Sequence, residues 1–249
     1  MDFSGKKVLI TGSSRGIGLG IAQGFAKTRA QLHLLADHEQ IYDVAKTLGA
    51  TPYLADITNT AEIRECFAKM PALDVLINNA GLERLTPLDD LSDETAATFS
   101  RILSVNVTGT YLVTRAALPK MEQGARIIST SSVWGRVAEP LFGAYVASKH
   151  AIIGMTKCWA KELGPRGINV NAVAPGWVRT ESALRSLKYL AERGHVAEEA
   201  LLEQILSGQA LPGLMEPYDM AGVYLFLASP YAVNITGQTI GADRGEAPW

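Results

Sequence analysis

Three side chains near the middle of the sequence have the types and spacing of a proton-transfer site. Tyr145 and Lys149 are four residues apart, so on a helix their side chains lie on one face. Ser132 lies upstream, at the end of an apolar run that begins at Ile127. A phenol ionises near pH 10, and a nearby cation favours its phenolate form. The spacing therefore predicts a tyrosine whose pKa is lowered by Lys149, although an exposed pair on a helix surface has the same spacing.

A glycine-rich segment near the N-terminus has the pattern of a phosphate-binding turn. It follows a short predicted strand at residues 8–10 and precedes a helical pattern that continues to about residue 28. Gly12, Gly16 and Gly18 allow the backbone to turn tightly and to approach a pyrophosphate, which the helix N-terminus then faces. The order of strand, loop and helix favours a nucleotide site over an ordinary turn.

The residue that ends the second predicted strand, residues 32–36, bears on which dinucleotide binds. Asp37 lies about twenty residues after Gly18, where an acidic residue is expected to hold an adenosine ribose. Its carboxylate would accept hydrogen bonds from both ribose hydroxyls and repel a 2′-phosphate. Arg15 favours the opposite, because a guanidinium pairs with phosphate. We give Asp37 more weight and expect NAD rather than NADP, with a helix N-cap as the alternative role of Asp37.

Strand and helix patterns alternate along the chain. Further strands are predicted at residues 52–55, 75–77, from 127, at 168–173 and at 238–241, with helices at 38–48, 60–69, 93–121, through Tyr145 to about 164, and at 219–227. This alternation predicts one α/β domain over residues 1–249: a Rossmann-like, doubly wound, seven-stranded parallel sheet with helices on both faces. Residues 178–211 interrupt the alternation with a polar helical pattern, which we interpret as a substrate lid.

The composition excludes several classes of protein. The net charge of −2 gives no electrostatic reason to expect nucleic-acid or membrane partners. No segment has the length of a membrane span or the pattern of a signal peptide, so we expect a cytoplasmic protein. Cys66 and Cys158 lack the spacing of a metal site or a disulfide framework, and both are predicted to be buried apolar side chains. The four histidines have no ligand spacing, so no metal is expected.

Taken together, the motifs resemble those of the short-chain dehydrogenase/reductase family. They occur along the whole chain in that family's order: Thr11-Gly-x-x-x-Gly-Ile-Gly18, Asp56, Asn78-Asn-Ala-Gly81, Asn106, Ser132, Tyr145-x-x-x-Lys149 and Pro175-Gly176. The resemblance implies a nicotinamide-dependent oxidoreductase that interconverts a secondary alcohol and its carbonyl compound by hydride transfer. It also implies a homotetramer or homodimer, in which the C-terminal Trp249 could reach a neighbouring active site.

The resemblance implies a role for each matching residue. Tyr145 would be the general acid or base, Lys149 would lower its pKa and bind the nicotinamide ribose, and the oxidised nicotinamide ring would add a second positive charge. Ser132, rather than its neighbour Ser131, would orient the substrate oxygen. The predicted cofactor contacts, besides Tyr145 and Lys149, are Gly12, Ser14, Arg15, Gly16, Ile17, Gly18, Asp37, Asp56, Ile57, Asn79, Ala80, Gly81, Pro175, Gly176, Val178 and Thr180.

Two predictions concern Asn106. The resemblance implies that it holds a water in a proton relay. Independently, asparagine is unfavourable in a helix interior, so its position predicts a local distortion of the helix at 93–121, with its side chain or backbone binding the water.

The sequence says less about the substrate pocket than about the cofactor site. Besides Ser132, the candidate wall of the substrate pocket consists of Glu83, Trp134, Arg136, Glu139, Phe142 and Trp177. Aromatic faces beside polar groups suit a sugar, a polyol or a similar hydroxylated small molecule, although aromatic residues also form cores and subunit interfaces. The balanced charges of the lid give no indication of an anionic substrate.

Two other functions remain open at this point. One is an NADPH-dependent reductase of 3-oxoacyl thioesters or related ketones, for which Arg15 would have to outweigh Asp37. The other is a non-catalytic nucleotide sensor on the same fold, against which the intact set of Asn106, Ser132, Tyr145 and Lys149 argues.

Overall fold

A single parallel sheet forms the centre of the molecule in the computed structural model, which describes residues 1–248. Its strand order is β3-β2-β1-β4-β5-β6-β7, and every neighbouring pair is parallel. The strands are β1 (Lys7–Thr11), β2 (Gln31–Ala36), β3 (Thr51–Leu54), β4 (Val75–Asn78), β5 (Arg126–Thr130), β6 (Asn169–Pro175) and β7 (Thr239–Ala242). The order reverses between β1 and β4, which opens a crevice at the carboxyl ends of these strands. The predicted doubly wound, seven-stranded sheet is confirmed.

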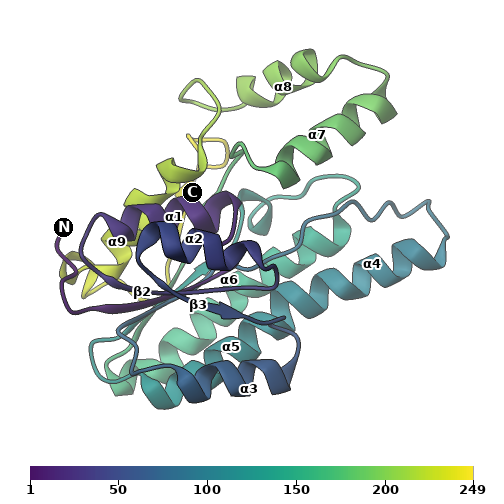
Figure 1. Ribbon diagram of the computed structural model, residues 1–249. Helices are drawn as coiled ribbons and strands as arrows, with labels where there is room; N and C mark the ends of the chain where they lie inside the picture. The colour runs from purple at the N-terminus through teal and green to yellow at the C-terminus, as the bar shows by residue number, and fades with distance from the viewer. Residues whose placement is uncertain (249) are drawn as a thin grey trace.

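Helices cover both faces of this sheet (Figure 1). One face carries α1 (Gly16–Ala26), α2 (Gln40–Leu48) and α9 (Ala221–Ala228); the other carries α3 (Thr60–Lys69), α5 (Thr110–Ala117) and α6 (Gly143–Leu163), with α4 (Asp93–Leu103) beside α6. Successive side chains of β1 point to opposite faces, so Ile10 joins Phe25 in one apolar core while Leu9 joins Phe67 in the other. Burial on both faces explains why the central strands are almost continuously apolar.

The helix predicted at residues 93–121 is interrupted. Between α4 and α5 the chain forms a π-helical segment, Ser104–Gly109, and α5 ends in a 3-10 turn, Leu118–Lys120. The distortion expected at Asn106 is therefore present. The Asn106 amide oxygen accepts a hydrogen bond from the Leu82 amide at 2.7 Å, and its nitrogen donates to the Leu82 carbonyl and to Ser148 Oγ, both at 2.9 Å. The π-helical segment thus ties this helix to the loop after β4.

Two helices occupy the region in which the alternation of strands and helices stops. They are α7 (Glu181–Gly194) and α8 (Glu198–Ser207), and they project from the body of the molecule in Figure 1. Leu187 and Ala191 of α7 are buried, whereas no residue of α8 is buried. Both helices fall within residues 178–211, where the sequence has a polar helical pattern, and the action of this region as a lid stays a prediction.

One prediction about the cysteines is wrong. Cys158 is exposed, and Cys66 is only partly buried. Position 158 falls on the side of α6 opposite its buried residues, such as Thr156 and Ala160, so the helix presents the thiol away from the sheet. No helix in residues 1–248 is long and apolar enough to cross a membrane. Trp249, which was predicted to reach a neighbouring subunit, lies outside the described residues.

Candidate active site

The turn between β1 and α1 is fixed by positions that exclude a side chain. A Cβ atom on Gly12, whose φ is +64°, would lie 2.6 Å from the Cα of Ala80. A Cβ atom on Gly18 would lie 2.1 Å from the carbonyl oxygen of Gly12 and 2.5 Å from the side-chain nitrogen of Asn79. Glycine therefore lets β1, α1 and the end of β4 approach one another. The free N–H groups of the first turn of α1 suit an anion there.

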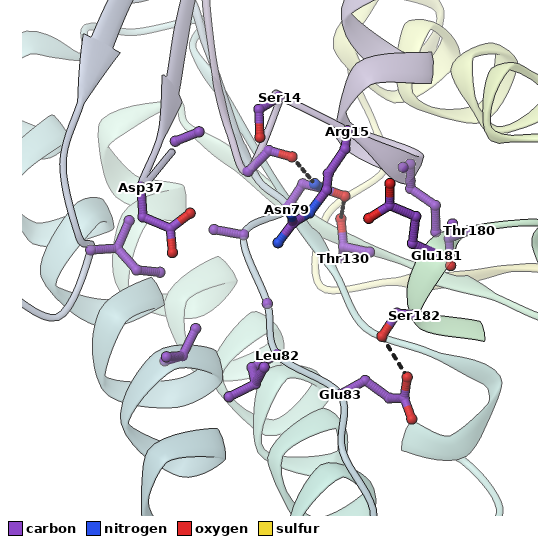
Figure 2. A pocket seen from close by; sticks show the side chains of 18 of the residues that line it. Ser14, Arg15, Asp37, Asn79, Leu82, Glu83, Thr130, Thr180, Glu181 and Ser182 are labelled. Carbon is purple, nitrogen blue, oxygen red and sulfur yellow. Dashed lines mark hydrogen bonds between the residues drawn. The ribbon is translucent and has the colours of Figure 1, made fainter. Parts of the chain in front are cut away.

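Asn79 joins the ends of three strands. Its side-chain nitrogen donates to the carbonyl oxygens of Thr11 and Gly12, both at 3.2 Å, and its side-chain oxygen accepts a hydrogen bond from Thr130 Oγ1 at 3.3 Å (Figure 2). The Thr11 hydroxyl in turn accepts from the backbone amides of Asn79 and Ala80, both at 3.0 Å. The crevice between β1, β4 and β5 is thereby fixed before any ligand binds.

A cavity of about 610 Å³ opens over these strand ends (Figure 2). It is lined by most of the predicted cofactor contacts: Gly12, Ser14, Arg15, Gly16, Ile17, Asp37, Asp56, Ile57, Asn79, Ala80, Gly81 and Thr180. Gly18 lies behind the turn, Pro175 ends β6, and Gly176 and Val178 line a second, smaller cavity. The volume falls within the range of ligand sites, and the glycine turn leaves room for a pyrophosphate, so these residues fit a dinucleotide.

Two opposite charges face the large cavity. Asp37 and Arg15 both line it, and both are exposed (Figure 2). Asp37 is not a helix cap, because the N-cap of α2 is Glu39. Asp56 also lines the cavity, but its carboxylate accepts hydrogen bonds from the backbone and side chain of Thr58 and pairs with Arg101 at 2.7 Å. Asp37 is thus the more available of the two carboxylates.

Helix α6 brings the predicted catalytic residues together beside the end of β5. Lys149 is buried, and its Nζ donates to the carbonyl oxygen of Thr130 at 2.8 Å while lying 5.4 Å from the centroid of the Tyr145 ring. The two neighbouring serines have different roles. The Ser131 hydroxyl donates to the backbone carbonyl of Lys149 at 2.9 Å, whereas Ser132 lines the smaller cavity and is hydrogen-bonded to Tyr145. Ser132 is therefore the serine that faces a cavity.

Burial dominates the ionisation of the tyrosine and the lysine. It raises the pKa of Tyr145, the charge of Glu83 raises that pKa further, and the hydrogen bond with Ser132 opposes both effects. Burial also lowers the pKa of Lys149 to about 8. The lowered tyrosine pKa predicted from the Tyr145–Lys149 spacing is therefore wrong for the protein groups alone, because burial and the charge of Glu83 together raise the pKa.

The smaller cavity, of about 100 Å³, opens beside Ser132 and is walled by aromatic side chains. Trp134 lies 6.0 Å from both Tyr145 and Trp177, measured between ring centroids, and both contacts are edge to face. Trp134 and Trp177 line the cavity. Phe142 lies 4.7 Å behind Trp134 and is fully buried without lining either cavity, so the structure corrects its predicted place in the substrate wall. As the residue just before α6, it joins the apolar core beneath that wall.

Several contributors to the site carried no signal in the sequence. Thr130 supplies the carbonyl oxygen that binds Lys149, and Ser148 fixes Asn106. Ser182 and Ser186 of α7 line the smaller cavity, and their spacing of four residues on a helix is the one pattern that could have indicated a shared face. Within the described residues, no group of three or more His, Cys, Asp and Glu side chains could hold a metal ion.

Comparisons with known sequences identify the family of the chain. A family model described as "Enoyl-(Acyl carrier protein) reductase" matches residues 12–246. The chain is 32% identical to D-beta-hydroxybutyrate dehydrogenase from Cupriavidus necator, an alignment that covers 97% of this chain and 98% of that protein. It is 35% identical to 3-oxoacyl-(acyl-carrier-protein) reductase FabG from Rickettsia felis, with 98% of each chain covered.

Some solved structures with the same fold are complexes with a nicotinamide cofactor. A short chain dehydrogenase from Burkholderia cenocepacia in complex with NADP matches with a TM-score of 0.86 and 31% identity, covering 99% of both chains. A variant of actinorhodin polyketide ketoreductase with NADPH matches with a TM-score of 0.90 and 28% identity, covering 98% of both chains. The family match and the similar proteins both span nearly the whole chain. This protein is therefore an oxidoreductase of the short-chain dehydrogenase/reductase family, whose fold binds a nicotinamide cofactor.

Proposed function

We propose that this protein uses NAD to interconvert a secondary alcohol of a small hydroxylated molecule, such as a sugar or polyol, and its ketone. The observation that carries the proposal is the meeting of Tyr145 and Lys149 with Ser132, which lines the smaller of two cavities that share Glu83 in their walls. The larger cavity has the size and the glycine turn for a dinucleotide, and the smaller has room for a small substrate. A polar reacting group would then lie beside Ser132.

The chain's own residues would hold the cofactor as follows. Gly12, Gly16 and the N-terminus of α1 would bind the pyrophosphate, Asp37 the adenosine ribose, and Lys149 the nicotinamide ribose. A bound nicotinamide would supply the hydride donor or acceptor and, when oxidised, a positive charge. Burial of Lys149 leaves its pKa at about 8, so near neutral pH it is mostly an ammonium that can donate to a ribose hydroxyl.

Tyr145 would exchange the proton with the substrate oxygen, which Ser132 would orient. Because burial raises the pKa of Tyr145, its phenol is ready to donate a proton to a carbonyl oxygen in the direction of reduction. In the direction of oxidation, a positive charge beside the phenol would favour the phenolate that accepts the proton. The side chain of Asn106 is hydrogen-bonded to Leu82 and Ser148, so a relay water at this residue would contact its backbone.

A second candidate is an NADPH-dependent reductase of 3-oxoacyl thioesters or related ketones. Arg15 lines the large cavity and offers a partner for a 2′-phosphate. The similarity to FabG and to a structure in complex with NADP gives this candidate further support. The choice between the two candidates depends on whether Asp37 or Arg15 dominates at the adenosine ribose.

The test compares kcat/KM for NAD⁺ and NADP⁺ with a panel of secondary alcohols, and for NADH and NADPH with the matching ketones. We expect NAD to be preferred at least about tenfold, and Asp37→Asn to remove most of that preference, because an acceptor without charge no longer repels a 2′-phosphate. Asp43→Asn on α2, an exposed carboxylate away from the cavity, is the matched control and should leave the preference unchanged.

Two results would contradict the proposal. A preference of the native protein for NADP⁺ would refute the cofactor assignment and favour the second candidate. The absence of turnover with every alcohol and ketone, together with intact nucleotide binding, would refute the oxidoreductase role of this site.

A further inference from the structure

One carboxylate faces the smaller cavity. Of the described residues that line it, Glu83 is the one with a charged side chain; the others are polar, aromatic, aliphatic or glycine. Glu83 also lines the large cavity, so it lies where the two cavities meet. Any substrate held between Ser132 and the two tryptophans would therefore lie beside this negative charge.

The Glu83 carboxylate is held in place by α7. One oxygen accepts a hydrogen bond from Ser182 Oγ at 2.6 Å, and the other accepts from Ser186 Oγ at 2.5 Å (Figure 2 shows the bond to Ser182). The preceding residue, Leu82, is bonded on both its amide and its carbonyl to Asn106. Each carboxylate oxygen can accept a second hydrogen bond, so acceptor capacity remains for a ligand.

Two arginines near Glu83, Arg84 and Arg185, donate to its backbone carbonyl oxygen. The Arg185 guanidinium donates to the backbone carbonyl of Glu83 at 3.5 Å and to Ser182 Oγ at 2.8 Å. Arg185 and the adjacent Arg84 line the large cavity and do not line the small one. Serine hydroxyls orient the carboxylate without neutralising it, so it is the charged group among the described residues that line the small cavity. Its charge also acts on Tyr145, whose pKa burial and then Glu83 raise.

The aromatic walls favour the same kind of ligand as the carboxylate. Trp134 and Trp177 line the cavity together, at 6.0 Å between their ring centroids. The face of an indole attracts a cation, and the attraction grows when the cation is shielded from water. An ammonium group thus suits both kinds of wall, whereas a carboxylate would meet the negative charge of Glu83.

We propose that Glu83 selects a substrate that carries an ammonium group close to its reacting carbon: a small amino alcohol or the matching amino ketone. This inference rests on the proposed function and narrows its substrate class. It separates the present chain from its similar protein named D-beta-hydroxybutyrate dehydrogenase, whose named substrate is an anion. We expect the ammonium compound to be the preferred substrate, a neutral diol to be second and a hydroxycarboxylate to be last.

Three compounds with one carbon skeleton test the order: 4-amino-2-butanol as the cation, 1,3-butanediol as the neutral compound and 3-hydroxybutyrate as the anion. With saturating NAD⁺ at pH 7, we expect kcat/KM for the cation to exceed that for the anion by more than about tenfold. Glu83→Gln keeps the shape of the side chain and one acceptor for the serines but removes the charge. This variant should reduce the ratio of cation to anion by at least about tenfold.

Asp89→Asn is the matched control. Asp89 lies on the same loop and pairs with Arg193 of α7 at 3.0 Å, but its side chain is 72% exposed and does not line either cavity. It therefore removes one negative charge and one link to α7 without changing the cavity, and the ratio should stay as in the native protein. An equal drop of the ratio in both variants would overturn the inference, because the effect would then come from the attachment of α7.

Binding provides a readout that does not depend on turnover. Trp134 and Trp177 line the cavity, so binding of each compound to the protein with NAD⁺ can be followed by quenching of tryptophan fluorescence. The inference would be supported if the cation binds more tightly than the anion and if this difference is lost in Glu83→Gln. This holds even if no compound is oxidised, in which case the proposed function alone would fail. No difference among the three compounds, including no binding of any, or a preference for the anion would overturn the inference.

Discussion

The two cavities of this protein are built from different kinds of contact. The large one rests on backbone groups: Gly12 and Gly18 lie too close to other atoms for any side chain, and the Asn79 amide bonds the ends of three strands. The small one is enclosed by side chains, chiefly Trp134, Trp177 and the first turns of α7. The nucleotide side therefore depends on positions where only glycine fits. The substrate side depends on side chains that can be replaced by others.

The nucleotide side and the substrate side also differ in how deeply their elements are buried. β1, β4 and β5 are buried along nearly their whole length, whereas α8, which extends the substrate side, has no buried residue (Figure 1). Segments with few buried contacts open at lower free energy than core strands. A change of substrate can thus be accommodated around α7 and α8 while the nucleotide side stays as it is.

Tyr145→Phe is the strongest test of whether turnover on the substrate side can be lost while nucleotide binding is kept. The phenylalanine ring keeps the packing against Trp134 but cannot exchange a proton, so kcat should fall about 1,000-fold. The dissociation constant for NADH, measured by fluorescence titration, should change less than about threefold. Tyr42→Phe on the exposed side of α2 is the control and should be fully active. Substantial residual kcat in Tyr145→Phe would remove this residue from the proposed proton transfer.

Lys149→Met tests the residue that lies between the two sides. The pKa of Lys149 in the folded protein, about 8, lies below its ordinary value of 10.5, so burying the ammonium destabilises the fold below pH 8. That destabilisation declines as the pH rises from about 8 to 10.5. The stability advantage of Lys149→Met over the native protein should therefore shrink across this range by up to about 3 kcal/mol.

Urea unfolding of both proteins at pH 7 and pH 10 measures this change. Lys157→Met, at an exposed position of the same helix, is the control and should show no such pH dependence relative to the native protein. A constant difference between Lys149→Met and the native protein at both pH values would contradict the burial of a charged Lys149.

Gly18→Ala tests the backbone character of the nucleotide side. The added methyl group would lie 2.1 Å from the Gly12 carbonyl oxygen, and the shift of the turn that relieves this contact should weaken NADH binding about 100-fold. Gly154→Ala in α6, where a Cβ meets no atom within 4 Å, is the matched control and should bind NADH normally with slightly higher stability. Near-ultraviolet circular dichroism should show the cluster around Trp134 intact in both variants; native NADH affinity in Gly18→Ala would contradict the close packing of the turn.

The parts of the structure that the sequence predicts are those set by local rules. Alternating strand and helix patterns indicate the sheet, the glycine spacing indicates the turn at Gly12, and an asparagine inside a helix indicates the distortion at Asn106. Helix spacing also places Tyr145 and Lys149 on one face. Each of these inferences uses residues close together in the chain, where backbone geometry limits the outcome.

The parts that the sequence leaves open depend on packing between distant segments. Trp134 and Phe142 look alike in the sequence, but only the packing around α6 shows that one lines a cavity and the other is fully buried. The pKa of Tyr145 depends on its removal from water, which no spacing reports. Likewise, Ser182 and Ser186 meet Glu83 from about a hundred residues away, so their contact follows only from the folded chain.

The π-helical segment Ser104–Gly109 also limits how this chain can change in length. A π-helical turn holds about one residue more than an α-helical turn, so deleting one residue here would restore regular α-helical geometry with little rotation of α5 relative to α4. Val113 and Ala117 would then keep their places in the apolar core that they share with β4 and α3, but Asn106 would lose the register that bonds it to Leu82 and Ser148. Among homologous chains, insertions and deletions should therefore accumulate around α8. The number of residues between Asn106 and Val113 should stay constant.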